Sequence, residues 1–472
     1  MRTHPDVRGL PLTAVGRSAV ERYDAAVDAY LASAADTGPL VEAVILADPG
    51  MAMAHCLEGY LLTLAGQPGL VARARESLAA ARRLAAGATP RERAHVDALA
   101  AWSAGDIRGT IDRLEAILLD HPRDILAFRL AHYLHFFIGD LLPMRDSAAR
   151  VMPRWDEEVP GYGFLLGCRA FTLEETGDCA EAERLGLRAI ELNPHDIWAG
   201  HAVAHVYETQ CRPRDGIAWI DRHAPLWREH GGFHRHLLWH RCLYYLELER
   251  HDAALDQYDT LVWASPSDEP LDIANAASLL MRLELLGVDV GRRWETVGEA
   301  AVDRIGFHNR PFNDVHMILA MCYGRRRNSA LGMLEEMRGF AATSPATIAP
   351  IMRDASIPLS EAVAAFAEGA YGRAVDLMLP IRYRWVAIGG SWAQRDLFQS
   401  MLIEAAVRAG RLALARALLA ERLALMPASR PSWRRYAAVL EAVGDADAAA
   451  SARAETARIA DRAPGPPPHP AH

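Results

Sequence analysis

Residues Ala52–Ala85 decide the fold of this chain, because they hold one complete structural repeat, AMAHCLEGYLLTLAGQPGLVARARESLAAARRLA. Apolar residues recur there at spacings of three and four, which is typical of amphipathic helices. Gly66 interrupts the pattern, and a glycine can take the left-handed conformation that closes a helix. The stretch therefore predicts two helices joined by a turn at Gly66.

The same pattern returns along the chain with a period of about 34 residues, which indicates stacked helix pairs. Clear copies cover 163–194 (GFLLGCRAFTLEETGDCAEAERLGLRAIELNP) and 396–427 (DLFQSMLIEAAVRAGRLALARALLAERLALMP), with turns at Gly177 and Gly410. Ala, Leu, Arg and Glu dominate and Val/Ile alternation is absent, so helices are expected nearly everywhere. Further copies are predicted to turn near these residues: Gly105, Gly139, Cys211, Glu249, Gly287, Arg325, Gly369 and Gly444.

These repeats predict an all-α protein, a right-handed and strongly curved superhelical α-solenoid of tandem tetratricopeptide-like helix pairs. The length of 472 residues would suggest about three globular domains. Repeats contact only their neighbours, however, so their core extends as a ribbon. We therefore expect one continuous solenoid over residues 1–461, with about ten or eleven helix pairs. Residues 462–472 (RAPGPPPHPAH) are expected to be a disordered tail, because proline disrupts helices.

Composition and charge exclude several classes of protein. The 51 basic and 60 acidic residues give a net charge of −9, which argues against nucleic acid or anionic lipid as the main partner. No apolar stretch approaches the ~20 residues of a membrane span, and no secretory signal is recognisable. The six cysteines form no C-x-x-C pair, and phosphate-binding glycine motifs are absent. We expect a cytoplasmic protein without nucleic-acid or membrane partners.

Six stretches sharpen the repeat assignment: HCLEGYLLTLAG (55–66), FTLEETGD (171–178), HAVAHVYE (201–208), WHRCLYYLELE (239–249), PFNDVHMILAM (311–321) and GGSWAQRD (389–396). They resemble the tetratricopeptide repeat protein 38 family, in the same order and at similar spacing over most of the chain. The resemblance implies the repeat fold and brings no assigned chemistry. Ordinary modules of this class carry Lys and Asn to grip peptide carboxylates. This chain carries His, Trp and Glu instead, so a clamp for a chaperone tail is not expected.

Histidines are concentrated in one part of the chain: nine of the 19 fall between His195 and His251. The repeat resemblance implies that the fifth, ninth and twelfth positions of a first helix face a ligand, and His201, His205 and Glu208 occupy them. Offsets of four and seven residues return to nearly the same helix face. The next repeat has the same arrangement in a second stripe: His236, His240 and Glu247.

Three interpretations of these stripes stay open. A histidine pair one turn apart can share a metal ion, and the metal set would be His201, His205, Glu208 and His240. H-E-x-x-H is absent, because Ala202 stands where that motif has its glutamate. Without metal, His205 or His240 would act as general base, oriented by Glu208 or Glu247. Alternatively the histidines only hydrogen-bond between helices. No cofactor is predicted, and a divalent metal remains an option.

Aromatic and polar residues add candidate ligand-binding groups. Trp239, next to His240, is the ring expected nearest a ligand, since pockets combine large rings with a few polar groups. In GGSWAQRD, Ser391 and Gln394 have the spacing of a capping box. Two glycines before a helix let an anion approach, with Arg395 as its partner. Gln394, Arg395 and Asp396 are therefore candidate ligand-binding residues.

The stretch PFNDVHMILAM supplies a third group. Asn313 or Asp314 is expected to cap the following helix, with Pro311 as the breaker. His316 lies one turn further on. Asp314 and His316, with His201 and His236, complete the predicted ligand-binding set. These groups meet only if the solenoid curls enough, which the sequence leaves open.

Three functions follow, and the sequence does not choose between catalysis and binding. The leading prediction is a groove rich in His, Trp and Glu that binds a small organic ligand or a short peptide. The first alternative is an enzyme with a His/Glu acid–base site, metal-assisted or not. The second is a scaffold for protein–protein interaction.

Overall fold

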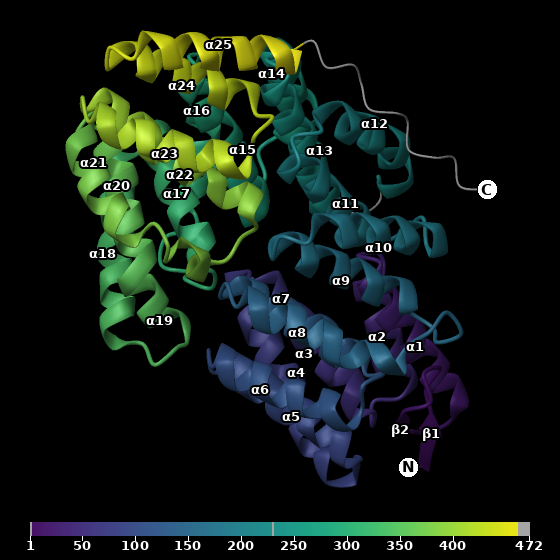
Figure 1. The fold of residues 1–472 in the computed structure, drawn as a ribbon. Helices are drawn as coiled ribbons and strands as arrows, with labels where there is room; N and C mark the ends of the chain where they lie inside the picture. The colour runs from purple at the N-terminus through teal and green to yellow at the C-terminus, as the bar shows by residue number, and fades with distance from the viewer. Residues whose placement is uncertain (1, 229–230, 461–472) are drawn as a thin grey trace. The chain divides into compact units, whose positions relative to one another are not determined.

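The structure is a computed structural model that describes residues 2–228 and 231–460, and helices make up nearly all of it (Figure 1). The chain packs as two compact units. The first contains residues up to Ala202 with 343–350, and the second contains most of the remaining residues from Val203 on. The division falls inside the helix α11 (Ile197–Thr209), between Ala202 and Val203.

The first unit consists of a short β-hairpin followed by consecutive helix pairs. Their bounds are β1 Arg2–Pro5, β2 Pro11–Ala14, α1 Arg17–Leu31, α2 Thr37–Ala47, α3 Ala52–Ala65, α4 Val71–Leu84, α5 Pro90–Ser103, α6 Ile107–Asp120, α7 Ile125–Phe137, α8 Leu141–Val151, α9 Tyr162–Glu175 and α10 Cys179–Leu192. Each helix contacts its neighbours in sequence, such as α3 with α4 and α5, as expected for stacked repeats.

The second unit continues the series of pairs. Its helices are α12 Pro213–His223, α13 Gly231–Glu247, α14 His251–Gln257, α15 Pro270–Leu285, α16 Arg293–Val302, α17 Pro311–Tyr323, α18 Arg327–Thr343, α20 Ile357–Ala367, α21 Tyr371–Met378, α22 Trp392–Arg408, α23 Leu412–Leu425, α24 Arg430–Ala442 and α25 Ala446–Ala460. A short helix, α19 (Ile348–Ile351), lies in the connection after α18. Further 3₁₀ and π turns are η1 Pro68–Leu70, η2 Ala85–Gly87, η3 Met152–Arg154, η4 Ala224–Trp227, η5 Tyr258–Val262, η6 Met352–Ser356, η7 Leu379–Ile381 and η8 Trp385–Ile388.

The turns between paired helices lie where the sequence predicts them. Gly66 closes α3 with φ +62°, and Gly177 and Gly410 take φ values of +94° and +70°. The same left-handed backbone occurs at the non-glycine turns Cys211 and Glu249. It also occurs at the other predicted turns: Gly105, Gly139, Gly287, Arg325, Gly369 and Gly444. The prediction of an all-α solenoid of tandem helix pairs is confirmed.

The sequence patterns missed two features at the N-terminus. The β1–β2 hairpin pairs Arg2 with Ala14 in antiparallel register, and its turn has Gly9 at φ +80°. The Asp6 carboxylate stabilises that turn by accepting hydrogen bonds from the Arg8 and Leu10 amides. The second missed feature is the helix pair α1–α2, which precedes the first repeat recognised in the sequence. Four-residue strands are too short for an alternation pattern to reveal.

Some contacts within the second unit join helices that are not consecutive in the chain. Helices α15 and α22, which lie about a hundred residues apart in the chain, pack against each other, and α17 packs on both α15 and α20 (Figure 1). The second unit is therefore curled, and α15 faces the helix that carries the end of GGSWAQRD. The prediction of one continuous solenoid over 1–461 stays a prediction, and the predicted tail, 462–472, lies outside the described residues.

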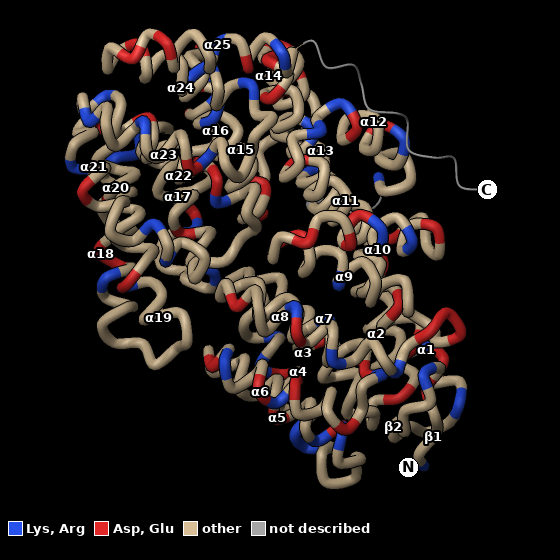
Figure 2. Tube along the Cα trace, viewed as in Figure 1, with Lys and Arg blue, Asp and Glu red and all other residues tan. Residues whose placement is uncertain are grey.

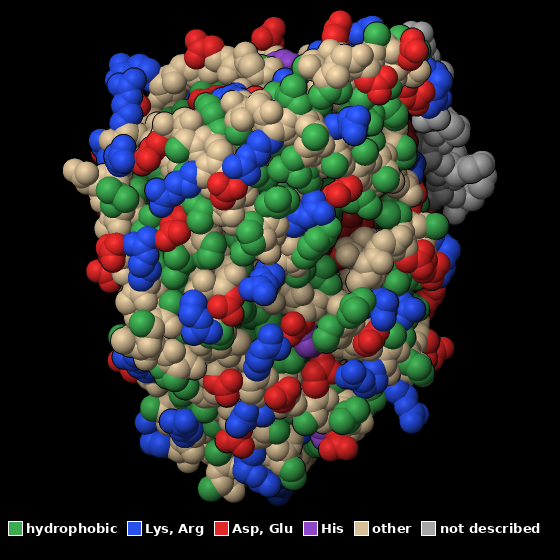
Figure 3. Space-filling view, turned by 60° about the vertical axis from the view of Figure 1, so that its left-hand side comes forward, with side chains coloured by type: hydrophobic (Ala, Val, Ile, Leu, Met, Phe, Trp, Pro, Cys, Tyr) green, Lys and Arg blue, Asp and Glu red, His purple; other side chains and the backbone are tan. Residues whose placement is uncertain are grey.

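Charged residues are distributed over all these helices, with acidic and basic segments interleaved along the trace (Figure 2). The face drawn in Figure 3 shows the same mixture of acidic and basic side chains between apolar ones. Among the helices of residues 2–228 and 231–460, none is long and apolar enough to cross a membrane.

Candidate functional site

Helices α11 and α13 bring three histidines of the second unit together. The ring of His240 lies 4.5 Å from that of His205 and 4.9 Å from that of His236, centre to centre. All three side chains are buried. The two helices belong to consecutive repeats, and the one-turn spacing of His236 and His240 puts both rings on the same face of α13. The predicted clustering of these histidines is therefore present.

Acceptors on neighbouring helices orient two of the rings. His240 donates from Nδ1 to the Glu208 carboxylate at 2.7 Å, and His236 donates from Nδ1 to Asn275 Oδ1 at 3.1 Å. Burial lowers the pKa of His236 to about 3, despite the raising effect of Asn275, so this ring is neutral. Of the two acids that the sequence offered as partners for a histidine, Glu208 and Glu247, it is Glu208 that orients His240.

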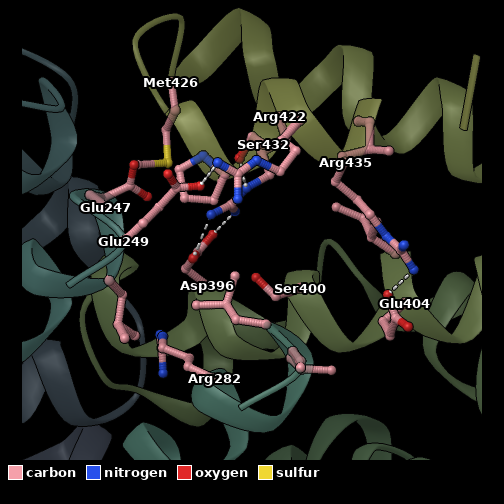
Figure 4. Close-up of a pocket in the computed structure, with 18 of the residues that line it drawn as sticks. Glu247, Glu249, Arg282, Asp396, Ser400, Glu404, Arg422, Met426, Ser432 and Arg435 are labelled. Atoms are coloured by element: carbon pink, nitrogen blue, oxygen red, sulfur yellow. Dashed lines mark hydrogen bonds and ion pairs between the residues drawn. The ribbon is translucent and has the colours of Figure 1, made fainter. Parts of the chain in front are cut away.

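A cavity of about 530 Å³ lies inside the second unit (Figure 4). Glu208 belongs to its lining and also accepts the hydrogen bond of His240. Helices α13, α15, α22, α23 and α24 contribute to its wall, which combines apolar residues with many charged ones. The charged lining residues are Glu208, Glu247, Glu249, Glu284, Asp396 and Glu404 with Arg282, Arg408, Arg422, Arg434 and Arg435. A cavity of this size fits a small organic molecule.

Most of these charges neutralise one another within the wall. Arg422 binds both carboxylate oxygens of Asp396, one of them at 3.0 Å. Glu404 accepts a hydrogen bond from Arg408 Nε at 2.7 Å. It accepts another from Arg435 (Figure 4). Arg430 and Arg434 pair with Glu249 in the same way. These pairs build the wall and leave little charge for a ligand.

Arg282 differs from the other arginines of the cavity. Within the described part of the chain, its guanidinium has no carboxylate within 4.0 Å and donates instead to Ser278 Oγ and, at 2.6 Å, to the Ala393 carbonyl. It also lies 5.5 Å from the Trp239 ring centre. Burial lowers the pKa of Arg282 to about 10, although Asp396 and Glu208 act in the opposite direction. Arg282 is thus a buried cation without a direct counter-ion.

Glu247 is the corresponding acid. Its carboxylate accepts a hydrogen bond from Ser429 Oγ at 3.2 Å, and burial raises its pKa to about 7 against the lowering effect of Arg422. The sequence interpretation offered Glu247 as an alternative partner for a histidine. That alternative is wrong for His240, because Glu208 accepts its hydrogen bond while Glu247 points to Ser429.

The GGSWAQRD segment reaches the cavity through its last residue. Ser391 and Gln394 form the predicted capping box at the start of α22, and Arg395 donates to the Gly390 carbonyl. Of the three predicted residues Gln394, Arg395 and Asp396, it is Asp396 that lines the cavity. The structure requires glycine at position 390, because its φ is +78° and a Cβ there would lie 2.6 Å from the Phe312 ring.

The PFNDVHMILAM residues lie elsewhere in the second unit. Helix α17 begins at Pro311 with Arg310 as N-cap, so the prediction that Asn313 or Asp314 caps it was wrong. Proline at the first helical position needs no amide partner, which explains the earlier start. Asp314 accepts from His308 Nδ1 at 3.2 Å. His316 donates from Nδ1 to the Phe312 carbonyl, and burial lowers its pKa to about 4. Asp314 and His316 are both absent from the cavity lining.

Two predicted residues are held by aromatic contacts. His201, in the first unit, stacks on Phe171 at 5.7 Å and lies 5.4 Å from Trp198. Trp239 is completely buried, with its ring 5.3 Å from His236 and 4.8 Å from His240. Trp239 is not among the residues that line the cavity, and its role as the ring nearest a ligand stays a prediction.

Three cavity residues escaped the sequence analysis: Arg282, Glu404 and Arg422. Asn275, which accepts a hydrogen bond from His236, escaped it as well. Arg282 had a usable signal, because it stands in a predominantly apolar stretch, IANAASLLMRLELL, where a charge is costly. The others look like ordinary polar positions, and their convergence depends on the contact between distant helices.

No protein-family model matches the sequence. Among solved structures, similarity is found to a human IFIT1 dimer with m7Gppp-AAAA, at 12% identity and a TM-score of 0.39 over 86% of this chain and 90% of that one. The TPR domain of P58(IPK) shares 12% identity over 78% and 93% of the two chains, with a TM-score of 0.22. Naa15/Naa10 bound to HypK-THB shares 10% over 94% and 76%, at 0.24. At these TM-scores the likeness supports no functional argument.

Proposed function

We propose that the second unit is a binding module whose cavity takes a small zwitterionic organic molecule, a class that includes amino acids and short peptides. The observation that carries the proposal is Arg282, a buried cation without a carboxylate partner among the described residues, in the wall of a cavity of about 530 Å³. A buried charge is costly unless it is paired, so a ligand carboxylate or phosphate is a natural partner for it.

The opposite wall supports a cationic group on the same ligand. Among the described residues, Glu247 has a serine hydroxyl as its one hydrogen-bond partner, and Glu208 also lines the cavity. With Glu247 charged, the six acids and five arginines of the lining sum to −1 (5 − 6). Within the described chain, Arg282 and Glu247 have opposite charges and no ion-pair partner, so a ligand with one anionic and one cationic group complements both, whereas a singly charged ligand complements only one.

The test uses three zwitterions of increasing length, glycine, γ-aminobutyrate and ε-aminocaproate, with butyrate and butylamine as singly charged analogues. We expect at least one zwitterion to raise the thermal unfolding midpoint of the full chain, because a ligand that binds only the folded state stabilises it. Butyrate and butylamine should have no effect at the same concentration.

Variants locate the effect. Arg282→Met and Glu247→Ala should each abolish the shift, whereas Arg382→Met, in the same unit but outside the cavity lining, should retain it. The proposal is wrong if no zwitterion stabilises the protein, or if Arg282→Met responds like the wild type.

A second candidate, an acid–base enzyme, rests on the 2.7 Å hydrogen bond between His240 and Glu208 at the cavity wall. A carboxylate that orients an imidazole is a common arrangement for a general base. Glu208→Gln would separate the two functions. It should remove any turnover of a bound molecule, while the zwitterion-induced stabilisation, carried by Arg282 and Glu247, persists.

The finer sequence predictions belong here as well. We retain membership of the tetratricopeptide repeat protein 38 family on the six stretches quoted above, together with a cytoplasmic location. A protein–protein scaffold is the remaining alternative. It is distinguished by His205→Ala, which should leave partner binding intact in a scaffold because a buried ring does not face a protein partner.

A further inference from the structure

The three clustered histidines have the geometry of a metal site. One ring nitrogen from each of His205, His236 and His240 lies within 4.8 Å of the others. Three imidazoles on a Zn²⁺ ion, at Zn–N distances of ~2.0–2.1 Å, have their nitrogens roughly 3.4 Å apart. Small rotations of the rings would bring these nitrogens from the observed separation to that one.

The hydrogen bonds of the two α13 histidines fit the same role. His240 and His236 both use Nδ1 as a donor, to the Glu208 carboxylate and to the Asn275 side-chain oxygen. This arrangement fixes the tautomer and makes Nε2 the lone-pair nitrogen of each ring. Histidines that bind metals typically donate their other N–H to a carboxylate or carbonyl in this way.

The charge state of the cluster is also suitable. A divalent ion would add positive charge beside three rings that are all buried. Glu208 contributes one negative charge at hydrogen-bond distance from His240, which offsets part of the charge of a divalent ion. The sequence prediction placed Glu208 among the metal ligands and left His236 out. In the structure Glu208 instead accepts a hydrogen bond from His240.

We propose that His205, His236 and His240 bind a divalent first-row transition metal ion, with Zn²⁺ the ion best suited to three imidazoles. Glu208 and Asn275 act as positioning residues for two of the rings. The three imidazoles would supply three of the four ligands of a tetrahedral ion. The site is independent of the proposed zwitterion binding, which rests on Arg282 and Glu247.

The test measures Zn²⁺ binding to the tag-free full chain, stripped with a chelator, in competition with a chromophoric chelator. We expect one equivalent per chain. His236→Gln and His240→Gln should each weaken binding at least tenfold, and Glu208→Gln by about 10- to 100-fold. His316→Gln is the matched control, because His316 is equally buried in the same unit and outside the cluster.

Two results would overturn the proposal: less than a tenth of an equivalent of zinc on the wild type, or equal affinities in His236→Gln and His316→Gln. Circular dichroism checks that each variant is folded. If a histidine variant does not fold, Co²⁺ replaces Zn²⁺ on the wild type. Visible bands of tetrahedral Co²⁺ with nitrogen and oxygen ligands then support the site, and a spectrum of hexaaqua Co²⁺ refutes it. Loss of zinc binding with retained zwitterion binding would refute only this inference.

Discussion

The Asp124 network of the first unit and the cavity of the second unit bury charge in opposite ways. In the first unit, Arg91 donates to Asp124 at 2.6 Å and His95 lies 3.0 Å from the same carboxylate, while Arg91 also donates to the Pro11 carbonyl of the hairpin. Each group of this Asp124 network has a partner of complementary chemistry, whereas Arg129 of the same unit is buried against Cys168 and Tyr133. In the second unit, Arg282 and Glu247 lack a direct ion-pair partner among the described residues and face a cavity. Complete pairing marks a structural network, and incomplete pairing beside a cavity marks a site for a ligand.

The largest expected effect comes from breaking the first network. Asp124→Asn should lower the free energy of unfolding by about 3–5 kcal/mol, since it leaves Arg91 buried without its counter-ion. Burial alone would raise the pKa of Asp124, but His95 and Arg91 hold that pKa well below its usual range. The stabilisation is therefore present above the usual Asp pKa of about 4 and is lost only as the pH falls further.

Urea denaturation at neutral pH measures this loss. Asp120→Asn, at the exposed end of α6, is the control and should change the stability by less than about 0.5 kcal/mol. Similar losses for the two variants would contradict a structural role for the Asp124 network.

Glu247 should give the opposite dependence on pH. Its pKa is raised from 4.5 to about 7 in the folded protein, so the folded state holds a proton that the unfolded state loses. Stability should therefore fall as the pH rises from about 4.5 to about 7, by up to about 3 kcal/mol. Glu247→Gln, which cannot ionise, should remove this fall.

The measurement compares urea midpoints near pH 5 and pH 8 for the wild type and Glu247→Gln. The exposed Glu336→Gln, on α18, is the control and should keep the wild-type slope. An unchanged slope in Glu247→Gln would show that the titrating group lies elsewhere.

A smaller effect is expected at the loop that sets the position of α22. Gly390→Ala should cost about 1–3 kcal/mol, because it combines a left-handed backbone with a Cβ placed 2.6 Å from the Phe312 ring. Gly410 also has a positive φ, but its Cβ position is open, so Gly410→Ala should cost only about 1 kcal/mol. Thermal unfolding of both variants tests this order, and a reversed order would contradict it.

The smallest effect on stability is expected at Arg282. Arg282→Met should change the free energy of unfolding by less than about 1 kcal/mol, because it removes a buried charge that has no counter-ion in the described chain. Arg91→Met, which removes the arginine partner of Asp124 and leaves it His95, should instead cost about 3 kcal/mol or more. Equal costs in urea denaturation would make Arg282 a structural residue and remove the contrast between the Asp124 network and the cavity.

Local sequence was enough for the helices and their turns. Cys211, Glu249 and Arg325 were located as turns without glycine, because the repeat period fixes where a helix must end. The hydrogen bonds of Ser391 with Gln394 likewise follow from a four-residue spacing. The histidine cluster was predictable to the extent that it combines one-turn spacings with adjacent repeats. The N-cap of α17 was not, because Pro311 competes with Asn313 and Asp314 for the start of the helix.

The sequence by itself thus determined the helix pairs, their turns and the face that carries His236 and His240, since these depend on interactions within a few turns of helix. Only the tertiary structure decided that Glu208 accepts the hydrogen bond of His240 and that Arg282 and Asp396 line one cavity. Those contacts join α11 with α13 and α15 with α22, and they depend on small rotations accumulated over successive repeats. Such rotations are set by packing along the whole unit and have no local signature.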